Sequence, residues 1–147
     1  KRLSVNIMLG LGDMKRLNSL LLFIFSNAAI RPSQAWTVSG VSVKKVPLQR
    51  NNADSPWCFA AASIIDLNQG DNFLATQVWP SARMAAAALQ QHLNPKWTVC
   101  EFGCGPGLPS LTAAKIGASR TIATDLDTFA LKLVQEAAAL QGLDSLE

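Results

Sequence analysis

Residues 99–110, VCEFGCGPGLPS, decide the fold of this chain, because a short apolar run leads into three closely spaced glycines. Gly103, Gly105 and Gly107 alternate with other residues, and Glu101 stands two positions before the first of them. A ligand lying across the end of a strand must approach the backbone closely. Glycines, which lack Cβ, permit that approach and the positive φ values of a tight turn. Backbone amides at the start of the following helix then face the ligand, so we predict a binding loop here.

The segments around this loop predict a repeated strand–helix unit. TVCEF at residues 98–102 and TIATD at 121–125 are predicted strands, while LPSLTAAKIG at 108–117 and TFALKLVQEAAALQG at 128–142 are predicted helices that end at glycines. Short joints between these elements predict parallel strands with right-handed crossovers. The expected fold class is therefore α/β with a Rossmann-like sheet.

Asp125 supplies a second acidic position, at the end of the second predicted strand. A carboxylate at this place can accept hydrogen bonds from both hydroxyls of a ribose. It could instead cap the next helix, although Asp127 and Thr128 are better placed for capping. Dinucleotide loops have the spacing GxGxxG, whereas this loop has GxGxG, and Glu101 would repel a pyrophosphate. That carboxylate suits the ammonium and sulfonium of a methionine-derived cofactor, which favours S-adenosylmethionine over NAD(P).

Two further elements are predicted upstream of the strand–helix unit. Alanine-rich residues 80–93, PSARMAAAALQQHL, predict a helix that begins with Pro80, a residue favoured at the first helical position. The short runs SIIDL at 63–67 and FLATQVW at 73–79 contain β-branched and aromatic residues and are separated by residues 68–72, which include NQGD. This pattern predicts an antiparallel hairpin ahead of the helix.

Residues 99–125 resemble the first two motifs of class I S-adenosylmethionine-dependent methyltransferases. Together with VWPSARMAAAAL at residues 78–89, they are similar to the small methyltransferase-like family of protein-lysine methyltransferases. The resemblance covers about residues 60–143. It implies a Rossmann-like class I methyltransferase sheet, truncated after its second β-α unit because the family's later strands have no counterpart here. It also implies S-adenosylmethionine as the cofactor and a protein lysine as the methyl acceptor.

The resemblance assigns roles to particular residues. Trp79 would lie against the bound cofactor, with an ordinary core aromatic before a helix as the alternative. Asp125 would hold the ribose. The cofactor loop would be formed by Glu101, Gly103, Gly105 and Gly107. We name no catalytic residue, because the substrate-selecting motifs of the family have no counterpart in this sequence.

Composition excludes several other classes of protein. A chain of 147 residues is long enough for one domain with a core. Its composition, 49% hydrophobic and 16% charged, is unlike that of a disordered chain. The net charge is +3, and much of it lies before residue 50, so no nucleic-acid surface is predicted. Cys58, Cys100 and Cys104 lack metal-ligand spacing, so neither a disulfide framework nor a metal site is expected. His92 is expected on the surface.

The first part of the chain predicts a targeting segment. Residues 14–35 combine a methionine, two positive charges and a short apolar run, as in a signal peptide. The run is too short for a stable membrane span, which needs about 20 residues. We expect the secretory pathway or a plastid if this segment is a leader, and the cytoplasm if it is a buried helix. Residues 36–60 predict a linker, and 61–147 predict the N-terminal part of the methyltransferase domain.

Three hypotheses for function follow. The first is a methyltransferase that uses S-adenosylmethionine and acts on protein lysine, with a protein substrate as partner. The second is an NAD(P)-dependent oxidoreductase of Rossmann fold, and the third is a non-catalytic fragment or pseudoenzyme. The sequence leaves the oligomeric state open.

Overall fold

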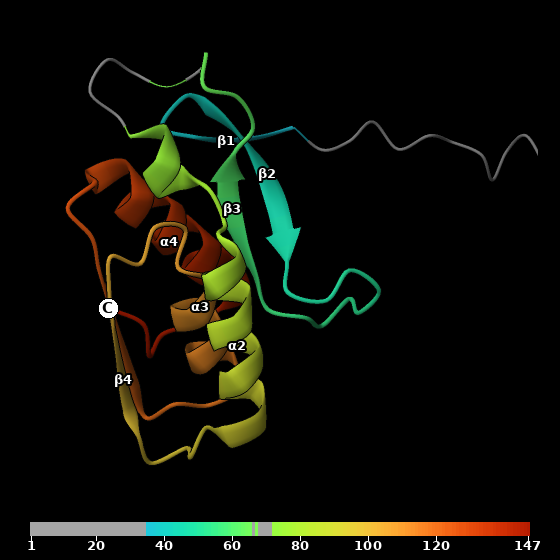
Figure 1. Cartoon of the computed structure of the whole chain (residues 1–147), viewed down its shortest axis with the longest axis vertical. Helices are drawn as coiled ribbons and strands as arrows, with labels where there is room; N and C mark the ends of the chain where they lie inside the picture. Colours follow the sequence, from blue (N-terminus) through green and yellow to red (C-terminus); the bar gives the residue numbers. More distant parts are fainter. Residues whose placement is uncertain (1–34, 66, 68–71) are drawn as a thin grey trace, which may run out of the picture. The chain divides into compact units, whose positions relative to one another are not determined.

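The computed structural model describes residues 35–65, 67 and 72–147, shown in Figure 1. Residues 14–34 of the predicted leader lie outside the described residues. None of the helices in the described ranges is both long and apolar enough to cross a membrane. The elements, in chain order, are β1 (Trp36–Val38), β2 (Val41–Pro47), β3 (Trp57–Ala61), the 3-10 helix η1 (Phe73–Thr76), α2 (Pro80–His92), β4 (Thr98–Phe102), α3 (Leu108–Lys115), β5 (Arg120–Thr124) and α4 (Thr128–Gln141).

Strands β4 and β5 form the parallel pair that the sequence predicts. Their register runs from Thr98 opposite Arg120 to Phe102 opposite Thr124, and α3 is the crossover between them. Residues 145–147 continue the sheet, because the amide of Ala123 donates to the carbonyl of Glu147 over 2.9 Å. The predicted α/β class with its strand–helix repeat is confirmed. The helix predicted from Pro80 is confirmed as α2.

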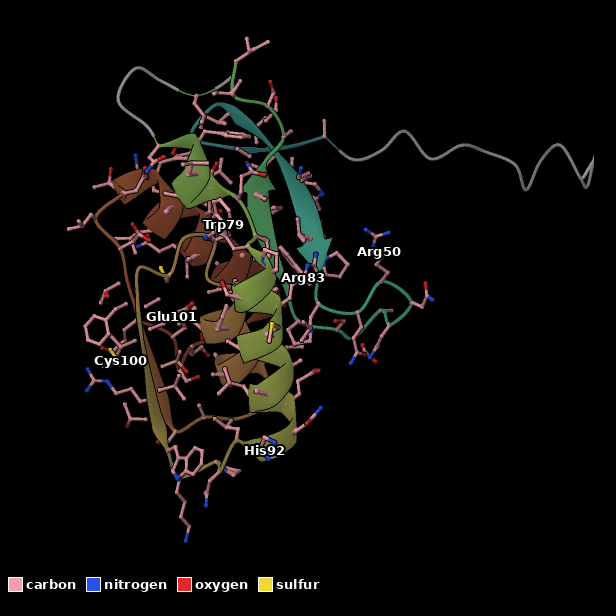
Figure 2. The ribbon with its side chains drawn as sticks, in the orientation of Figure 1. Arg50, Trp79, Arg83, His92, Cys100 and Glu101 are labelled. Atoms are coloured by element: carbon pink, nitrogen blue, oxygen red, sulfur yellow. The ribbon has the colours of Figure 1, made fainter. Side chains whose placement is uncertain are left out.

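One face of this parallel pair is covered and the other is exposed. Helix α3 packs against β4 and β5, and it lies beside β4 in Figure 1. Alternate residues of a strand point to opposite faces, so Glu101 faces the helix while Cys100 and Phe102 point away from it. The side chain of Phe102 is 84% exposed. Figure 2 shows Cys100 on the side of β4 away from the helices. The residues that the structure describes therefore cover one face of the pair.

The structure corrects the prediction of a linker over residues 36–60. β1, β2 and β3 form an antiparallel sheet in that order, with Val43 opposite Ala61 and Pro47 opposite Trp57. Alternating valines of β2 turn inward, since Val41 and Val43 are buried. The prolines and asparagines of this segment, which are typical of linkers, are confined to the end of β2 and the turn after it. The local composition therefore gave no indication that these segments pair as strands.

The predicted hairpin over residues 63–79 is wrong. Residues 63–65 and 67 carry no strand, and residues 73–76 form η1 instead. The side chain of Asn72 accepts a hydrogen bond from the amide of Leu74 over 3.0 Å, which caps this short helix. The hydrogen bond accepted by the Asn72 side chain thus stabilises a short helix in a segment whose residues have β propensity.

The core lies between the helices and the antiparallel sheet. Ala86 of α2 and Leu111 of α3 are fully buried where these two helices pack together. Leu133 of α4 is also fully buried, and α4 packs against β3, whose five residues are all buried. Residues at the carboxyl ends of β4 and β5 and at the start of α2 line one cavity, where the candidate site lies.

Candidate functional site

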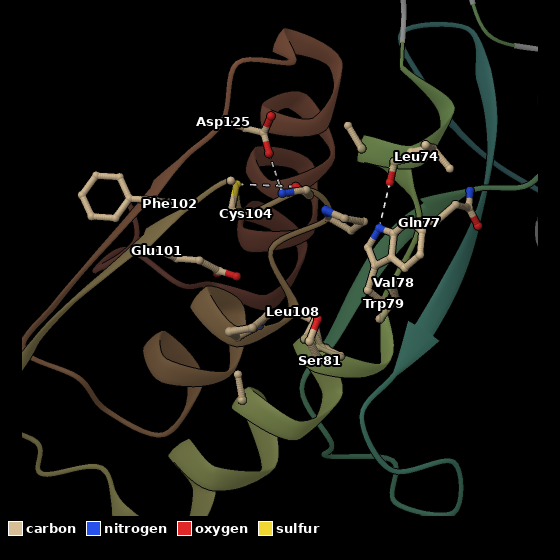
Figure 3. A pocket seen from close by; sticks show the side chains of 17 residues that line it. Leu74, Gln77, Val78, Trp79, Ser81, Glu101, Phe102, Cys104, Leu108 and Asp125 are labelled. Atoms are coloured by element: carbon tan, nitrogen blue, oxygen red, sulfur yellow. Dashed lines mark hydrogen bonds between the residues drawn. The ribbon is translucent and has the colours of Figure 1, made fainter.

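A cavity of about 320 Å³ lies where β4 ends, between the glycine loop, η1 and the start of α2 (Figure 3). Figure 3 shows Glu101 and Asp125 on one side of this cavity and Trp79 on the other. The structure brings together five of the six predicted site residues as lining residues: Trp79, Glu101, Gly103, Gly105 and Asp125. Gly107 does not line the cavity. The carboxyl ends of parallel strands are a usual place for a ligand in an α/β sheet.

Gly105 and Gly107 are required for two different close approaches. Gly105 has φ +51°, and a Cβ on it would lie 3.0 Å from the carbonyl oxygen of Ala75 in η1. Gly107 has φ +68°, and its Cβ would lie 2.6 Å from a methyl carbon of Val134 in α4. Gly105 therefore lets the loop pass under η1. Gly107 lets α3 start against α4, so its position is explained by packing rather than by contact with a ligand.

Asp125 ties the end of β5 to the glycine loop. Its Oδ2 accepts a hydrogen bond from the amide of Gly105 over 2.7 Å, and its Oδ1 accepts one from the amide of Asp127 over 2.8 Å. Asp127 is the N-cap of α4, and its Oδ1 accepts from the amides of Phe129 and Ala130 over 2.8 and 2.9 Å. The capping role that was the alternative for Asp125 is thus filled by Asp127. The carboxylate of Asp125 remains on the cavity wall.

Glu101 presents a second, partly buried carboxylate. Its Oε2 accepts hydrogen bonds from the amide and the hydroxyl of Ser110, over 3.0 and 2.5 Å. Burial raises the pKa of Glu101 above its usual range, the hydrogen bonds from Ser110 oppose this shift, and the nearby charge of Asp125 adds to it. The Glu101 carboxylate is therefore costly to charge in the folded protein unless a cationic partner approaches.

Trp79 lines the cavity and is not part of the core. It directly precedes α2, and its side chain is 51% exposed. The indole Nε1–H donates to the carbonyl of Leu74 over 3.1 Å, which fixes the ring against η1. Trp79 is therefore not the core aromatic that was its alternative role, and its ring borders the cavity.

The charges around the cavity have one sign. Its lining includes the carboxylates of Glu101 and Asp125 and, among the residues described, no lysine, arginine or histidine. Cys104 also lines it, and burial together with these two carboxylates raises the pKa of its thiol to about 12. Within the described ranges there is no group of three His, Cys, Asp or Glu residues suited to a metal ion. The cavity thus favours a positively charged ligand and disfavours a pyrophosphate.

Sequence reasoning missed Ser110 and the contribution of η1. Ser110 lies nine positions after Glu101, and only the packing of α3 against β4 brings the two together. Leu74 and Ala75 reach the site from η1, a segment for which the sequence predicted a strand. His92 is exposed at the end of α2, outside the cavity lining, as expected (Figure 2).

β4 and β5 are parallel and carry Glu101 and Asp125 at their carboxyl ends, and a GxGxG loop and a crossover helix join them, as in the Rossmann-like sheet of class I methyltransferases. The model of the family "Ribosomal protein L11 methyltransferase (PrmA)" matches residues 51–146. The chain belongs to this family. The finding confirms the class I resemblance noted in the sequence.

Three bacterial relatives carry the name ribosomal protein L11 methyltransferase. The chain is 40% identical over 73 residues to that of Alkaliphilus metalliredigens, covering 50% of this chain and 23% of the relative. It is 34% identical over 84 residues to that of Clostridium botulinum, covering 57% and 26%. It is 35% identical over 85 residues to that of Thermotoga maritima, covering 58% and 32%. The matches thus span between about a quarter and a third of each relative's length.

Proposed function

We propose that this protein is a methyltransferase that uses S-adenosylmethionine to methylate lysine side chains of a protein. The single observation that carries the proposal is the negative cavity at the end of β4, lined by Glu101 and Asp125 without a basic residue in the described part of its wall. S-adenosylmethionine carries a sulfonium and an ammonium, so two carboxylates suit it. NAD(P) carries a pyrophosphate, which the same carboxylates would repel.

The positions of the side chains suggest how the cofactor lies. Asp125 directly follows β5, where its remaining lone pairs can accept hydrogen bonds from the ribose hydroxyls. Glu101 is the penultimate residue of β4 and can receive the α-ammonium. The glycine loop between them offers backbone close to the ligand. Trp79 faces the loop across the cavity, where its ring can lie against the cofactor (Figure 3).

The chemistry asked of the protein is mainly positioning. When bound, S-adenosylmethionine supplies a methyl group on a sulfonium. Transfer of this methyl group to the acceptor breaks its bond to sulfur and leaves a neutral thioether. The residues around the cavity would hold the cofactor so that its methyl group can meet the acceptor. A lysine acceptor must lose a proton before it can attack. We assign no base among the described residues.

The acceptor class is inferred from the relatives and from the sequence resemblance together. The bacterial relatives are named for a ribosomal protein, which supports a protein substrate. The small methyltransferase-like family, which the sequence resembles, acts on protein lysine. A protein lysine is therefore the acceptor that we propose.

Calorimetric titration of the protein in its natural length tests the cofactor. S-adenosylmethionine should bind and NAD should bind more weakly or not at all. Tighter binding of NAD would favour the oxidoreductase hypothesis. Binding of neither ligand would favour the non-catalytic hypothesis. Transfer of a labelled methyl group to lysine residues of ribosomal protein preparations, read by mass spectrometry, then tests the acceptor.

A further inference from the structure

The hydroxyl of Ser110 contacts Glu101 in a way that orients the carboxylate. Ser110 is the third residue of α3 and is fully buried. Both its amide and its hydroxyl donate to the same oxygen of Glu101, Oε2. Gly107, which precedes α3, has no side chain to cap the helix, so Glu101 supplies the acceptor from the neighbouring strand. Two donors on one oxygen fix the position of the whole carboxylate group.

The other oxygen of Glu101 is left for a ligand. Among the residues that the structure describes, Oε1 has no hydrogen-bond partner. Within those ranges, Oγ1 of Thr121 is the sole buried side-chain N or O atom without a hydrogen-bond partner. Oε1 of Glu101 is therefore accessible to solvent. Glu101 lines the cavity, and its carboxylate points into it in Figure 3. Oε1 is therefore open to the cavity.

We propose that Ser110 is a positioning residue for cofactor binding: it holds Oε2 of Glu101 so that Oε1 faces the α-ammonium of the cofactor's amino-acid part. This inference rests on the proposed function. A glutamate side chain has several rotamers, and ordering them at the moment of binding reduces affinity. Ser110 orders the carboxylate before the ligand arrives. The same hydrogen bonds favour the charged form of the carboxylate, which an ammonium requires.

An alternative is that the pair only caps α3. In that case Ser110 would stabilise the helix and would not distinguish one ligand from another. Two probes separate these roles. S-adenosylhomocysteine contains the amino-acid part with its ammonium, whereas 5′-methylthioadenosine keeps the adenosine and the thioether but lacks the amino-acid part.

The first test is the affinity of Ser110→Ala for both probes, measured by calorimetry on the protein in its natural length. The variant loses the hydroxyl donor and keeps the amide. Affinity for S-adenosylhomocysteine should fall about tenfold, as for the loss of a hydrogen bond to a charged group. Affinity for 5′-methylthioadenosine should stay within about twofold, because that ligand makes no contact with Oε1. Ser110→Thr keeps both donors and should restore the selective binding.

A matched control comes from the same helix. Thr112 is fully buried, and its hydroxyl donates to the carbonyl of Leu108 and not to Glu101. Thr112→Ala therefore removes a buried hydroxyl from α3 without touching the carboxylate. It should change the affinities for the two probes equally or not at all.

A double-variant cycle tests whether Ser110 acts through Glu101. Glu101→Gln should weaken binding of S-adenosylhomocysteine selectively, and adding Ser110→Ala should then cause little further loss. Full additivity, or equal effects of Ser110→Ala on both probes, would overturn the positioning role while the proposed function stands. A wild-type protein that binds neither probe would overturn the proposed function, and this inference with it.

Discussion

Asp125 accepts a hydrogen bond from the amide of Gly105 over 2.7 Å, so the end of β5 holds the loop that follows β4. The carboxyl ends of β4 and β5 are therefore linked through this hydrogen bond. A change at Asp125 is expected to affect the loop as well as any contact that the carboxylate makes with a ligand.

Asp125→Ala should lower the affinity for S-adenosylmethionine by at least about tenfold. Hydrogen bonds to a charged carboxylate are worth about 1.5–3 kcal/mol each, and the loop anchor is lost as well. Calorimetric titration measures the effect, and circular dichroism checks the fold. Asp127→Asn is the control, because asparagine also caps helices. Unchanged affinity in Asp125→Ala would mean that Asp125 has only a structural role.

Gly107→Ala should destabilise the protein by about 2–4 kcal/mol, from overpacking and left-handed backbone strain together. Its Cβ would lie 2.6 Å from a methyl carbon of Val134. Gly103→Ala has a similar φ but no atom within 4 Å of the new Cβ, so it should cost only about 1–2 kcal/mol. Urea unfolding measures both. Val134→Ala should lower the free energy of unfolding less in a protein that already carries Gly107→Ala than in the wild type. Equal losses in the two backgrounds would contradict the steric explanation.

Glu101 should make stability depend on pH. Its folded pKa is raised above the usual value of 4.5, so the folded state holds this proton more tightly than the unfolded state. The stability that the raised pKa contributes is present below about pH 4.5 and is lost as the pH rises through the folded pKa. Glu101→Gln should flatten this part of the profile. Urea unfolding from pH 4 to 8 measures it.

Glu136→Gln, on the exposed side of α4, is the control for this profile. It should leave the curve as in the wild type. If Glu101→Gln also leaves it unchanged, the burial of Glu101 does not perturb its ionisation.

The 147-residue polypeptide expressed alone should bind a hydrophobic dye and melt broadly. The exposed face of β4 carries Phe102, and Trp97 just before the strand is 52% exposed. Exposed apolar side chains of this size favour association. Phe102→Thr should reduce dye fluorescence. A sharp monomeric melt without dye binding would contradict the prediction.

The targeting segment is testable without the structure, which does not describe residues 14–34. A fluorescent reporter fused after residue 40, with translation starting at Met14, should leave the cytosol if the segment is a leader. Replacing Lys15 and Arg16 by glutamine should weaken the export. A diffuse cytosolic signal from the unmodified fusion would argue for a structural role of the apolar run.

The unit from β4 to α4 could be predicted because its signals are local. Gly107, Gly117 and Gly142 mark the helix boundaries, and all three have positive φ. β1 to β3 could not be predicted in the same way. The pairing of Val43 with Ala61 crosses a turn rich in proline and asparagine, and such long-range pairing leaves a weak local pattern.

The candidate site was predictable in its residue types and less so in its contacts. Trp79, Glu101 and Asp125 were identified from spacing and resemblance, and the structure places them around one cavity. The contact between Ser110 and Glu101 depends on how α3 packs against β4. A serine inside a helix gives no sequence signal for that contact.

The protonated, buried thiol of Cys104 has a practical consequence for labelling. The thiolate is the form that reacts with maleimides, and burial also raises the pKa of Cys58 to about 12. Cys100 is the only exposed cysteine of the three in the chain. A maleimide dye at neutral pH should therefore attach selectively to Cys100 without any mutation, giving a reporter on the open face of β4 that responds when that face becomes covered.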